Sequence, residues 1–93
     1  MHAVVVEVDA SQADAEEAVR RLREEIVPRI KENPGFQSGT WLRLNEEAKG
    51  LGLVLFDSEE NAQAAASRFA VGDSPQPGVV VERNEVREVA VTA

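Results

Sequence analysis

The stretch ENPGFQSGTWLRL, residues 32–44, decides the fold of this chain. A long amphipathic pattern ends at Asn33-Pro34-Gly35, because proline cannot continue a helix and glycine permits the turn that closes it. The alternating residues that follow, 37–44, predict a strand that carries the only tryptophan, Trp41. A helix that stops sharply before a strand is the central junction of the predicted fold.

The segment before this junction predicts one long helix. Either Ser11 or Asp14 can cap its start, and small or apolar residues then recur at three- and four-residue steps as far as Ile30. Pro28 interrupts the pattern, since it lacks an N–H and its ring clashes with the preceding turn. We expect the helix to kink near Glu24 or a new turn to start at Pro28.

The remaining patterns predict three further strands and a second helix. The second helix starts after Ser58, a good N-cap residue, and covers residues 59–70. In the last segment, 79–91, the alternation slips between Val81 and Val86. Either a bulge lies near Arg83-Asn84, or that strand begins only at Glu85. The other predicted strands are residues 3–9 and 51–56, and a polar loop, 45–50, joins two antiparallel neighbours.

The order strand, helix, strand, strand, helix, strand is the βαββαβ arrangement of a ferredoxin-like α+β fold, an antiparallel sheet with two helices on one face. Apolar residues occupy both faces of these strands. We place the even-numbered valines of 3–9 with Leu42 and Leu44 on one face, and Val5 with Trp41 on the other. The strand 51–56 adds apolar residues to both. Since two helices cover only one face, we expect a homodimer that packs sheet against sheet.

Size and composition limit the classes of function. The 93 residues are expected to form one domain, 1–93, whose small core would benefit from oligomerisation. The net charge of −7 argues against binding of nucleic acid or of an anionic membrane surface, and no apolar run is long enough to span a bilayer. The absence of cysteine leaves no disulfide or thiolate metal site and favours a cytoplasmic protein.

Four stretches of the chain resemble the dimeric α/β-barrel superfamily, and in particular its antibiotic-biosynthesis-monooxygenase-like (ABM-like) domains. They are the helix end NPGF, the strand GTWLRL, the junction GLGLVLFDSEENA and the final strand EVREVAV. The resemblance implies that two protomers close their sheets into a barrel. It also implies relatives that are cofactor-free oxygenases of aromatic polyketides or quinols, or that degrade haem.

The catalytic residues of those enzymes do not match this sequence. The oxygenase-like relatives use an asparagine of the first strand with a tryptophan, and the haem degraders add a histidine ligand. Here the first strand has no asparagine, and Asn84 lies near the other end of the chain. His2, the sole histidine, precedes the first predicted strand, and no second metal ligand stands at a suitable spacing. We therefore expect no metal site and no cofactor.

Three residues are the candidates for ligand binding: Trp41, Arg43 and Glu7. Trp41 and Arg43 share one side of their strand, which we expect to face the dimer interior, where an aromatic ring beside a guanidinium could hold a flat anionic or phenolic ligand. Alternatively, Trp41 packs at the interface and Arg43 pairs with a carboxylate across it. Glu7 is either a proton acceptor in the barrel interior or a rim carboxylate paired with Arg43 or Arg87.

Two functions follow from these observations. The first is a small dimeric barrel protein that binds a hydrophobic or aromatic molecule, between helices and sheet or in the barrel, or that serves as an assembly module. The second is a cofactor-independent monooxygenase of a phenolic, quinol or polycyclic substrate, in which Trp41 and Arg43 orient the substrate and Glu7 or solvent takes the proton. The missing asparagine favours the first.

Overall fold

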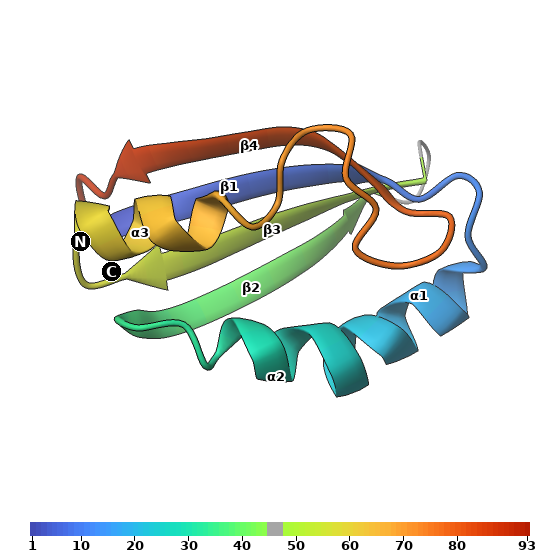
Figure 1. Cartoon of the computed structure of the whole chain (residues 1–93), viewed down its shortest axis with the longest axis horizontal. Helices are drawn as coiled ribbons and strands as arrows, with labels where there is room; N and C mark the ends of the chain where they lie inside the picture. The colour runs from blue at the N-terminus through green and yellow to red at the C-terminus, as the bar shows by residue number, and fades with distance from the viewer. Residues whose placement is uncertain (45–47) are drawn as a thin grey trace.

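The structure of this chain, a computed structural model, describes residues 1–44 and 48–93. The first half of the predicted loop 45–50, residues 45–47, therefore lies outside the described residues. The elements follow the predicted order (Figure 1): β1 (His2–Asp9), α1 (Ala15–Arg21), the π-helical segment η1 (Leu22–Ile26), α2 (Val27–Ile30), β2 (Phe36–Leu44), β3 (Lys49–Phe56), α3 (Glu59–Ala66) and β4 (Val80–Glu88).

The four strands form one antiparallel sheet in the order β2-β3-β1-β4. The helices pack on one face of it, so the predicted ferredoxin-like α+β fold is confirmed. The core between the layers contains Val4, Val54 and Phe56 from the sheet with Ala62 and Ala65 from α3, all buried. Among the described residues, no helix is long and apolar enough to cross a membrane.

Pro28 divides the long helix, as predicted. The π-helical segment η1 precedes it, and the Val27 N–H donates to the carbonyl of Leu22, five residues back. Because Pro28, the second residue of α2, has no N–H to offer and a bulky ring, the wider turn before it accommodates the proline. Of the two predicted caps, Asp14 is the one used: its Oδ1 accepts the Glu17 N–H at 2.9 Å.

The second helix ends earlier than predicted, at Ala66 rather than at residue 70. Ser58 caps its start, as expected, and accepts the Asn61 N–H at 3.1 Å. At its end, the Asn84 side chain of β4 donates to the carbonyls of Ala66 and Phe69 and so satisfies groups that a longer helix would have used. Phe69 still packs against the core.

The last strand starts at Val80, so the alternative start at Glu85 is wrong. The irregularity is a register shift: Glu7 pairs with Arg83 and Val8 with Val81, which leaves Glu82 as the extra residue. This is the bulge that the slipped alternation predicted, displaced by one residue from Arg83-Asn84.

The predicted face of Trp41 is wrong. In the sheet Trp41 pairs with Gly52 and Leu42 pairs with Leu51. Trp41 therefore packs against the core on the helix side, with Val54, while Leu42 lies on the outer face and is 53% exposed. Alternation fixes the faces within one strand, but only the register between strands decides which face is buried.

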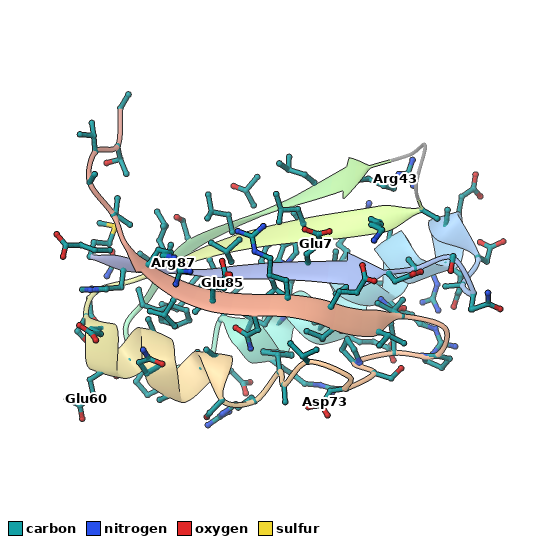
Figure 2. The ribbon with its side chains drawn as sticks, turned by 90° about the horizontal axis from the view of Figure 1, so that it is seen from above. Glu7, Arg43, Glu60, Asp73, Glu85 and Arg87 are labelled. Atoms are coloured by element: carbon teal, nitrogen blue, oxygen red, sulfur yellow. The ribbon has the colours of Figure 1, made fainter. Side chains whose placement is uncertain are left out.

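The outer face of the sheet carries apolar side chains that none of the described elements covers. Besides Leu42, Leu53 is 43% exposed there, and Val5 and Leu55 are half-buried. On the β1–β4 side the same face is charged, as Glu7, Glu85 and Arg87 show in Figure 2. Arg83 Nη1 lies 3.8 Å from Glu7, and both Arg83 and Arg87 contact Glu85. The prediction of apolar residues on both faces is thus confirmed.

Candidate functional site

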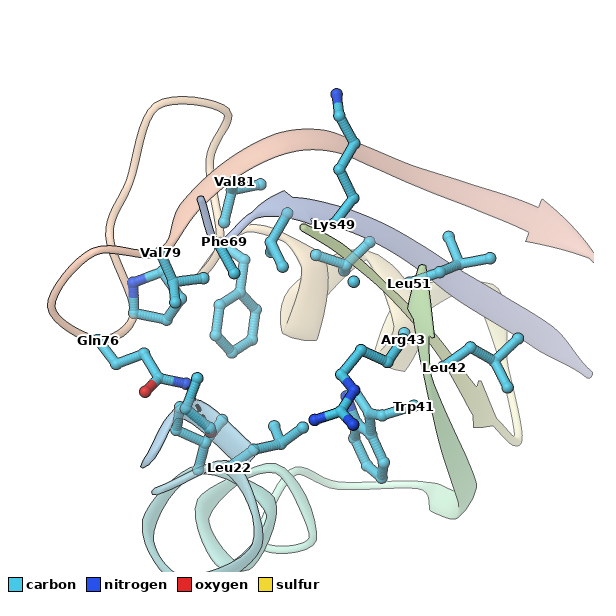
Figure 3. Close-up of a pocket in the computed structure, with 18 of the residues that line it drawn as sticks. Leu22, Trp41, Leu42, Arg43, Lys49, Leu51, Phe69, Gln76, Val79 and Val81 are labelled. Atoms are coloured by element: carbon cyan, nitrogen blue, oxygen red, sulfur yellow. Dashed lines mark hydrogen bonds between the residues drawn. The ribbon is translucent and has the colours of Figure 1, made fainter. Parts of the chain in front are cut away.

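A cavity of about 340 Å³ separates the long helix from the sheet. We call it the helix–sheet cavity (Figure 3). Its volume falls in the range of ~300–1,000 Å³ that is usual for small-molecule sites, which are also mostly apolar. Its walls are apolar side chains of the long helix, of the sheet and of the segment after α3, among them Val6, Val8, Leu22, Ile26, Trp41 and Phe69.

The cavity exists because small residues face each other across it. On β3, Gly50 and Gly52 pair with Val8 and Val6, at positions whose side chains would point toward the helix. Both glycines line the cavity, and the helix opposite presents alanines, such as Ala18, in its first turns. The larger side chains of the core fill the other end of the sheet, around Phe56, so the two layers close there and stay apart here.

The Trp41 indole lies flat over two glycines. A Cβ built on Gly39 would be 2.4 Å from Trp41 Cη2, and one built on Gly52 would be 2.9 Å from Trp41 Nε1. Any larger residue at either position would displace the ring. Within the described part of the chain, Trp41 Nε1 has no hydrogen-bond acceptor. The indole thus offers an aromatic wall to the cavity and an N–H donor that a bound molecule could use.

Arg43 stands at the rim of the cavity. It is two residues beyond Trp41, so both side chains leave β2 on the same face, as predicted, although this is the helix side and not the outer face. Figure 3 shows the guanidinium beside the indole, directed toward Leu22 of the long helix. This pair places a cation and an aromatic face at the entrance of an apolar space.

The loop between α3 and β4 forms another wall of the cavity, which the sequence did not predict. Gln76 Nε2 donates to the Ala18 carbonyl at 3.1 Å and ties the loop to the long helix. Gly78 has a positive φ of 80°, and a Cβ there would lie 2.6 Å from the Gln12 carbonyl oxygen. The only sequence signal was the proline and glycine content of residues 71–78, which indicates a loop but not what it covers.

Glu7 is not part of this site. It lies on the outer face, opposite Leu51 and Arg83, and its closest cation is Arg83 at 3.8 Å. The predicted partners, Arg43 and Arg87, are therefore wrong: Arg43 lies on the other side of the sheet, and Arg87 contacts Glu85 at 3.3 Å. The structure brings Trp41 and Arg43 together and separates Glu7 from both.

The remaining polar groups near the cavity are engaged within the chain. Lys49 donates to Glu82 at 2.7 Å, which raises the pKa of Lys49, and its ammonium points away from the cavity (Figure 3). His2 does not line the cavity, and its Nε2 lies 3.5 Å from Glu59 Oε2. The described residues contain no group of three or more His, Cys, Asp or Glu side chains that could hold a metal ion.

The comparison with solved structures shows that this chain shares its fold with proteins that bind or degrade haem-type molecules. One similar structure is a mutant of MhuD with two manganese protoporphyrin IX molecules bound per active site, 19% identical over 100% of this chain and 98% of that chain, with a TM-score of 0.67. Another is a haem-degrading protein from Mycobacterium tuberculosis, haem-free and cleaved, 22% identical over 97% and 98%, with a TM-score of 0.52. At these identities the likeness concerns the fold. No family model and no curated protein matches this chain.

Proposed function

We propose that this protein binds a small, flat, hydrophobic or aromatic molecule in the helix–sheet cavity. The observation that carries this proposal is the position of Trp41, whose ring forms one wall of an apolar cavity and rests on two glycines. An aromatic ligand can stack on the exposed side of that ring. Arg43 at the rim suits a polar or anionic edge of the same ligand, because a guanidinium both stacks and donates hydrogen bonds in its plane.

Solved structures of the same fold lend support, since one of them holds porphyrins in its active site. Haem itself does not fit the residues of this chain. Proteins hold haem iron through His, Cys, Met or Tyr side chains, and the described cavity lining contains none of these. The ligand that we propose is therefore bound by shape, stacking and hydrogen bonding, and not through an iron–side-chain bond.

The second function, cofactor-independent oxygenation, is supported only by the shared position of Trp41 and Arg43, which suits binding equally well. Val4, Val6 and Val8 are the residues of β1 that face the cavity, and none can orient a substrate by a hydrogen bond. Glu7, which the sequence offered beside solvent as a proton acceptor, lies on the other face of the sheet. We therefore propose binding and not catalysis.

We further propose that two copies of the chain pair through the outer faces of their sheets. The support is the exposure of Leu42 and Leu53 beside half-buried Val5 and Leu55, on a face that no helix within residues 1–44 and 48–93 covers. A two-fold axis would bring these apolar residues together and leave the charged β1–β4 side to pair at the rim. The cavity lies on the opposite face, so pairing leaves it accessible.

A titration with N-phenylnaphthylamine tests the binding proposal. This neutral, flat aromatic probe fluoresces when it leaves water. We expect it to bind, and Trp41→Ala to weaken its affinity roughly tenfold, because stacking and apolar contact are lost. The matched control is Thr40→Ala, which changes the adjacent, exposed residue on the outer face and should leave the affinity unchanged. Absence of binding to the native protein, or equal losses in the two variants, would contradict the proposal.

A further inference from the structure

A second hollow adjoins the helix–sheet cavity between the C-terminal end of the long helix and the loop that follows α3. We call it the arginine groove. It has a volume of about 420 Å³, and Arg29 of α2 and Arg68 of the segment after α3 both line it. The groove and the helix–sheet cavity share Ile26, Ile30 and Phe69 as lining residues. A molecule in the cavity therefore lies one side chain away from the groove.

Neither arginine forms an ion pair with a carboxylate of the described residues. Among the described residues, no Asp or Glu oxygen lies within 4.0 Å of the guanidinium of Arg29 or of Arg68. Several other arginines of this acidic chain are paired, for example Arg20 and Arg21 with Glu17. Two cations without partners on the flanks of one hollow form a local positive site on a molecule whose net charge is −7.

The other polar groups of the groove are already engaged within the chain. The Ser74 hydroxyl lies 2.7 Å from both the Gln76 and the Val79 carbonyl, and the Asn33 amide donates to the Ile30 carbonyl at 3.0 Å. Asp73 contributes one negative charge, and its Oδ2 accepts the Ala70 N–H at 3.0 Å. The two guanidiniums are thus the cationic donors of the groove, and their charge exceeds that of Asp73.

From this arrangement we infer that the ligand of the helix–sheet cavity is an amphipathic oxyanion. Its apolar body would occupy the cavity, and its carboxylate, sulfonate or phosphate group would lie in the arginine groove between Arg29 and Arg68. A planar guanidinium matches the geometry of such an oxyanion and can donate two parallel hydrogen bonds to it. This inference rests on the proposed function, and it specifies which end of the cavity receives the charge.

The test compares two probes that share an aromatic body and differ in charge. Anilinonaphthalene sulfonate carries one sulfonate, and N-phenylnaphthylamine is neutral. We expect Arg29→Gln and Arg68→Gln each to weaken binding of the sulfonate roughly threefold to tenfold, because each exposed guanidinium supplies a charged hydrogen bond in high dielectric. Binding of the neutral probe should not change. Added salt should weaken sulfonate binding by the native protein and affect the neutral probe far less.

Two control variants separate the possible outcomes. Arg23→Gln removes the same charge from an exposed position of η1 that lines neither hollow, and it should change neither affinity. Arg43→Gln removes the guanidinium at the rim of the helix–sheet cavity, away from the arginine groove, and so tests whether the anionic group lies there instead. If Arg29→Gln and Arg68→Gln bind both probes as tightly as the native protein does, or lose affinity for both probes equally, the inference is overturned while the proposed function stands. If sulfonate affinity falls only in Arg43→Gln, the charge lies at the rim and the inference is equally overturned. If the native protein binds neither probe, the proposed function itself fails.

Discussion

At the scale of single residues, Trp41 depends on the glycines beneath it. Gly39→Ala would place a Cβ 2.4 Å from the indole, and neither Gly39 nor Gly50 has a positive φ that would add backbone strain. We expect this substitution to tilt the ring, to shift the tryptophan emission and to lower the free energy of unfolding by about 1–3 kcal/mol, as overpacking does. Fluorescence and chemical denaturation measure both effects.

Gly50→Ala is the control for this prediction. Its Cβ would meet the Val8 Cγ2 methyl at 3.2 Å and the Leu42 carbonyl oxygen at 3.7 Å, and no atom of the indole. The control should leave the tryptophan emission unchanged and cost less stability. An emission spectrum that shifts equally in both variants would contradict the placement of the ring over Gly39.

The sequence predicted part of the site at this scale. The shared face of Trp41 and Arg43 followed from the two-residue period of a strand, and the structure keeps them together. The side of the sheet could not be derived in this way, because it depends on which residue of β3 each one pairs with. The pairing of Trp41 with Gly52 has a physical reason in hindsight: only a position without a side chain leaves room for the indole.

At the scale of elements, the first helix carries an ion-pair network that depends on pH. Arg20 and Arg21 donate to the Glu17 carboxylate and lower its pKa from an ordinary value of 4.5 to about 2. A carboxyl whose pKa is lowered by folding stabilises the native state above its unfolded pKa. That contribution is lost as pH falls from about 4.5 toward 2.

Glu17→Gln should therefore lower the melting temperature near neutral pH, and the difference from the native protein should vanish at pH about 2. The pairs are exposed, so we expect a decrease of no more than about 3 °C that high salt diminishes. Glu16→Gln makes the same change of charge in the same first turn without an ion pair. If the two variants lose stability equally across the pH range, the network contributes nothing.

A second element-scale prediction concerns the link between β4 and the end of α3. The Asn84 amide donates to the carbonyls of Ala66 and Phe69, which fixes the start of the loop that lines the cavity. Asn84→Asp keeps the shape but sets a carboxylate against two carbonyl oxygens in a half-buried site. We expect it to cost roughly 2–4 kcal/mol of stability.

Asn84→Ala serves as the comparison, since it removes the donors without adding a charge, and it should cost less than Asn84→Asp. Urea denaturation of both variants measures the difference. A smaller loss for Asn84→Asp than for Asn84→Ala would mean that the amide does not donate to these carbonyls.

The elements themselves were predicted in order and type, and so were several of their ends, such as Leu44, Phe56 and Glu59; the end of the second helix was not. The end of α3 is set by the side chain of Asn84, which is 18 residues away from Ala66, and a local pattern carries no information on such a contact. Pro28, by contrast, acts on its own turn, so its interruption of the long helix could be predicted. Local causes are visible in the sequence, and tertiary ones are not.

At the scale of the whole molecule, the proposed dimer makes the outer sheet face testable. Leu53→Glu would place a charge in the middle of the exposed apolar residues, and we expect it to raise the dimer dissociation constant at least about tenfold. Analytical ultracentrifugation measures this constant. Because Trp41 lies on the helix side, Trp41→Ala should leave it unchanged, contrary to the expectation from the sequence.

Val71→Glu is the matched control for this prediction. Val71 is 65% exposed in the loop after α3, away from the outer sheet face, and the substitution adds the same charge. It should not alter dimerisation. A native protein that sediments as a monomer at micromolar concentration, or a Leu53→Glu variant with native association, would contradict the proposed interface.

The helix–sheet cavity also belongs to this scale, and the sequence could not reveal it. It arises where alanines of one layer meet glycines of the other and where a distant loop closes the side. Each of these features has an ordinary local explanation. Alanine is a good helix former, glycine gives a strand little bulk, and the loop makes a turn. Only their meeting in space leaves a volume that a ligand could fill.

The most direct test of the central claim is a nitrogen–proton correlation spectrum recorded while N-phenylnaphthylamine is added. Trp41 is the only tryptophan, so its indole N–H gives a single resolved signal. We expect this signal to shift together with the amides of Val6 and Leu22, which line the cavity, while the amide of Leu53 on the outer face stays in place. Shifts confined to Leu53 and its neighbours, with an unmoved indole signal, would contradict the claim that the cavity is the binding site.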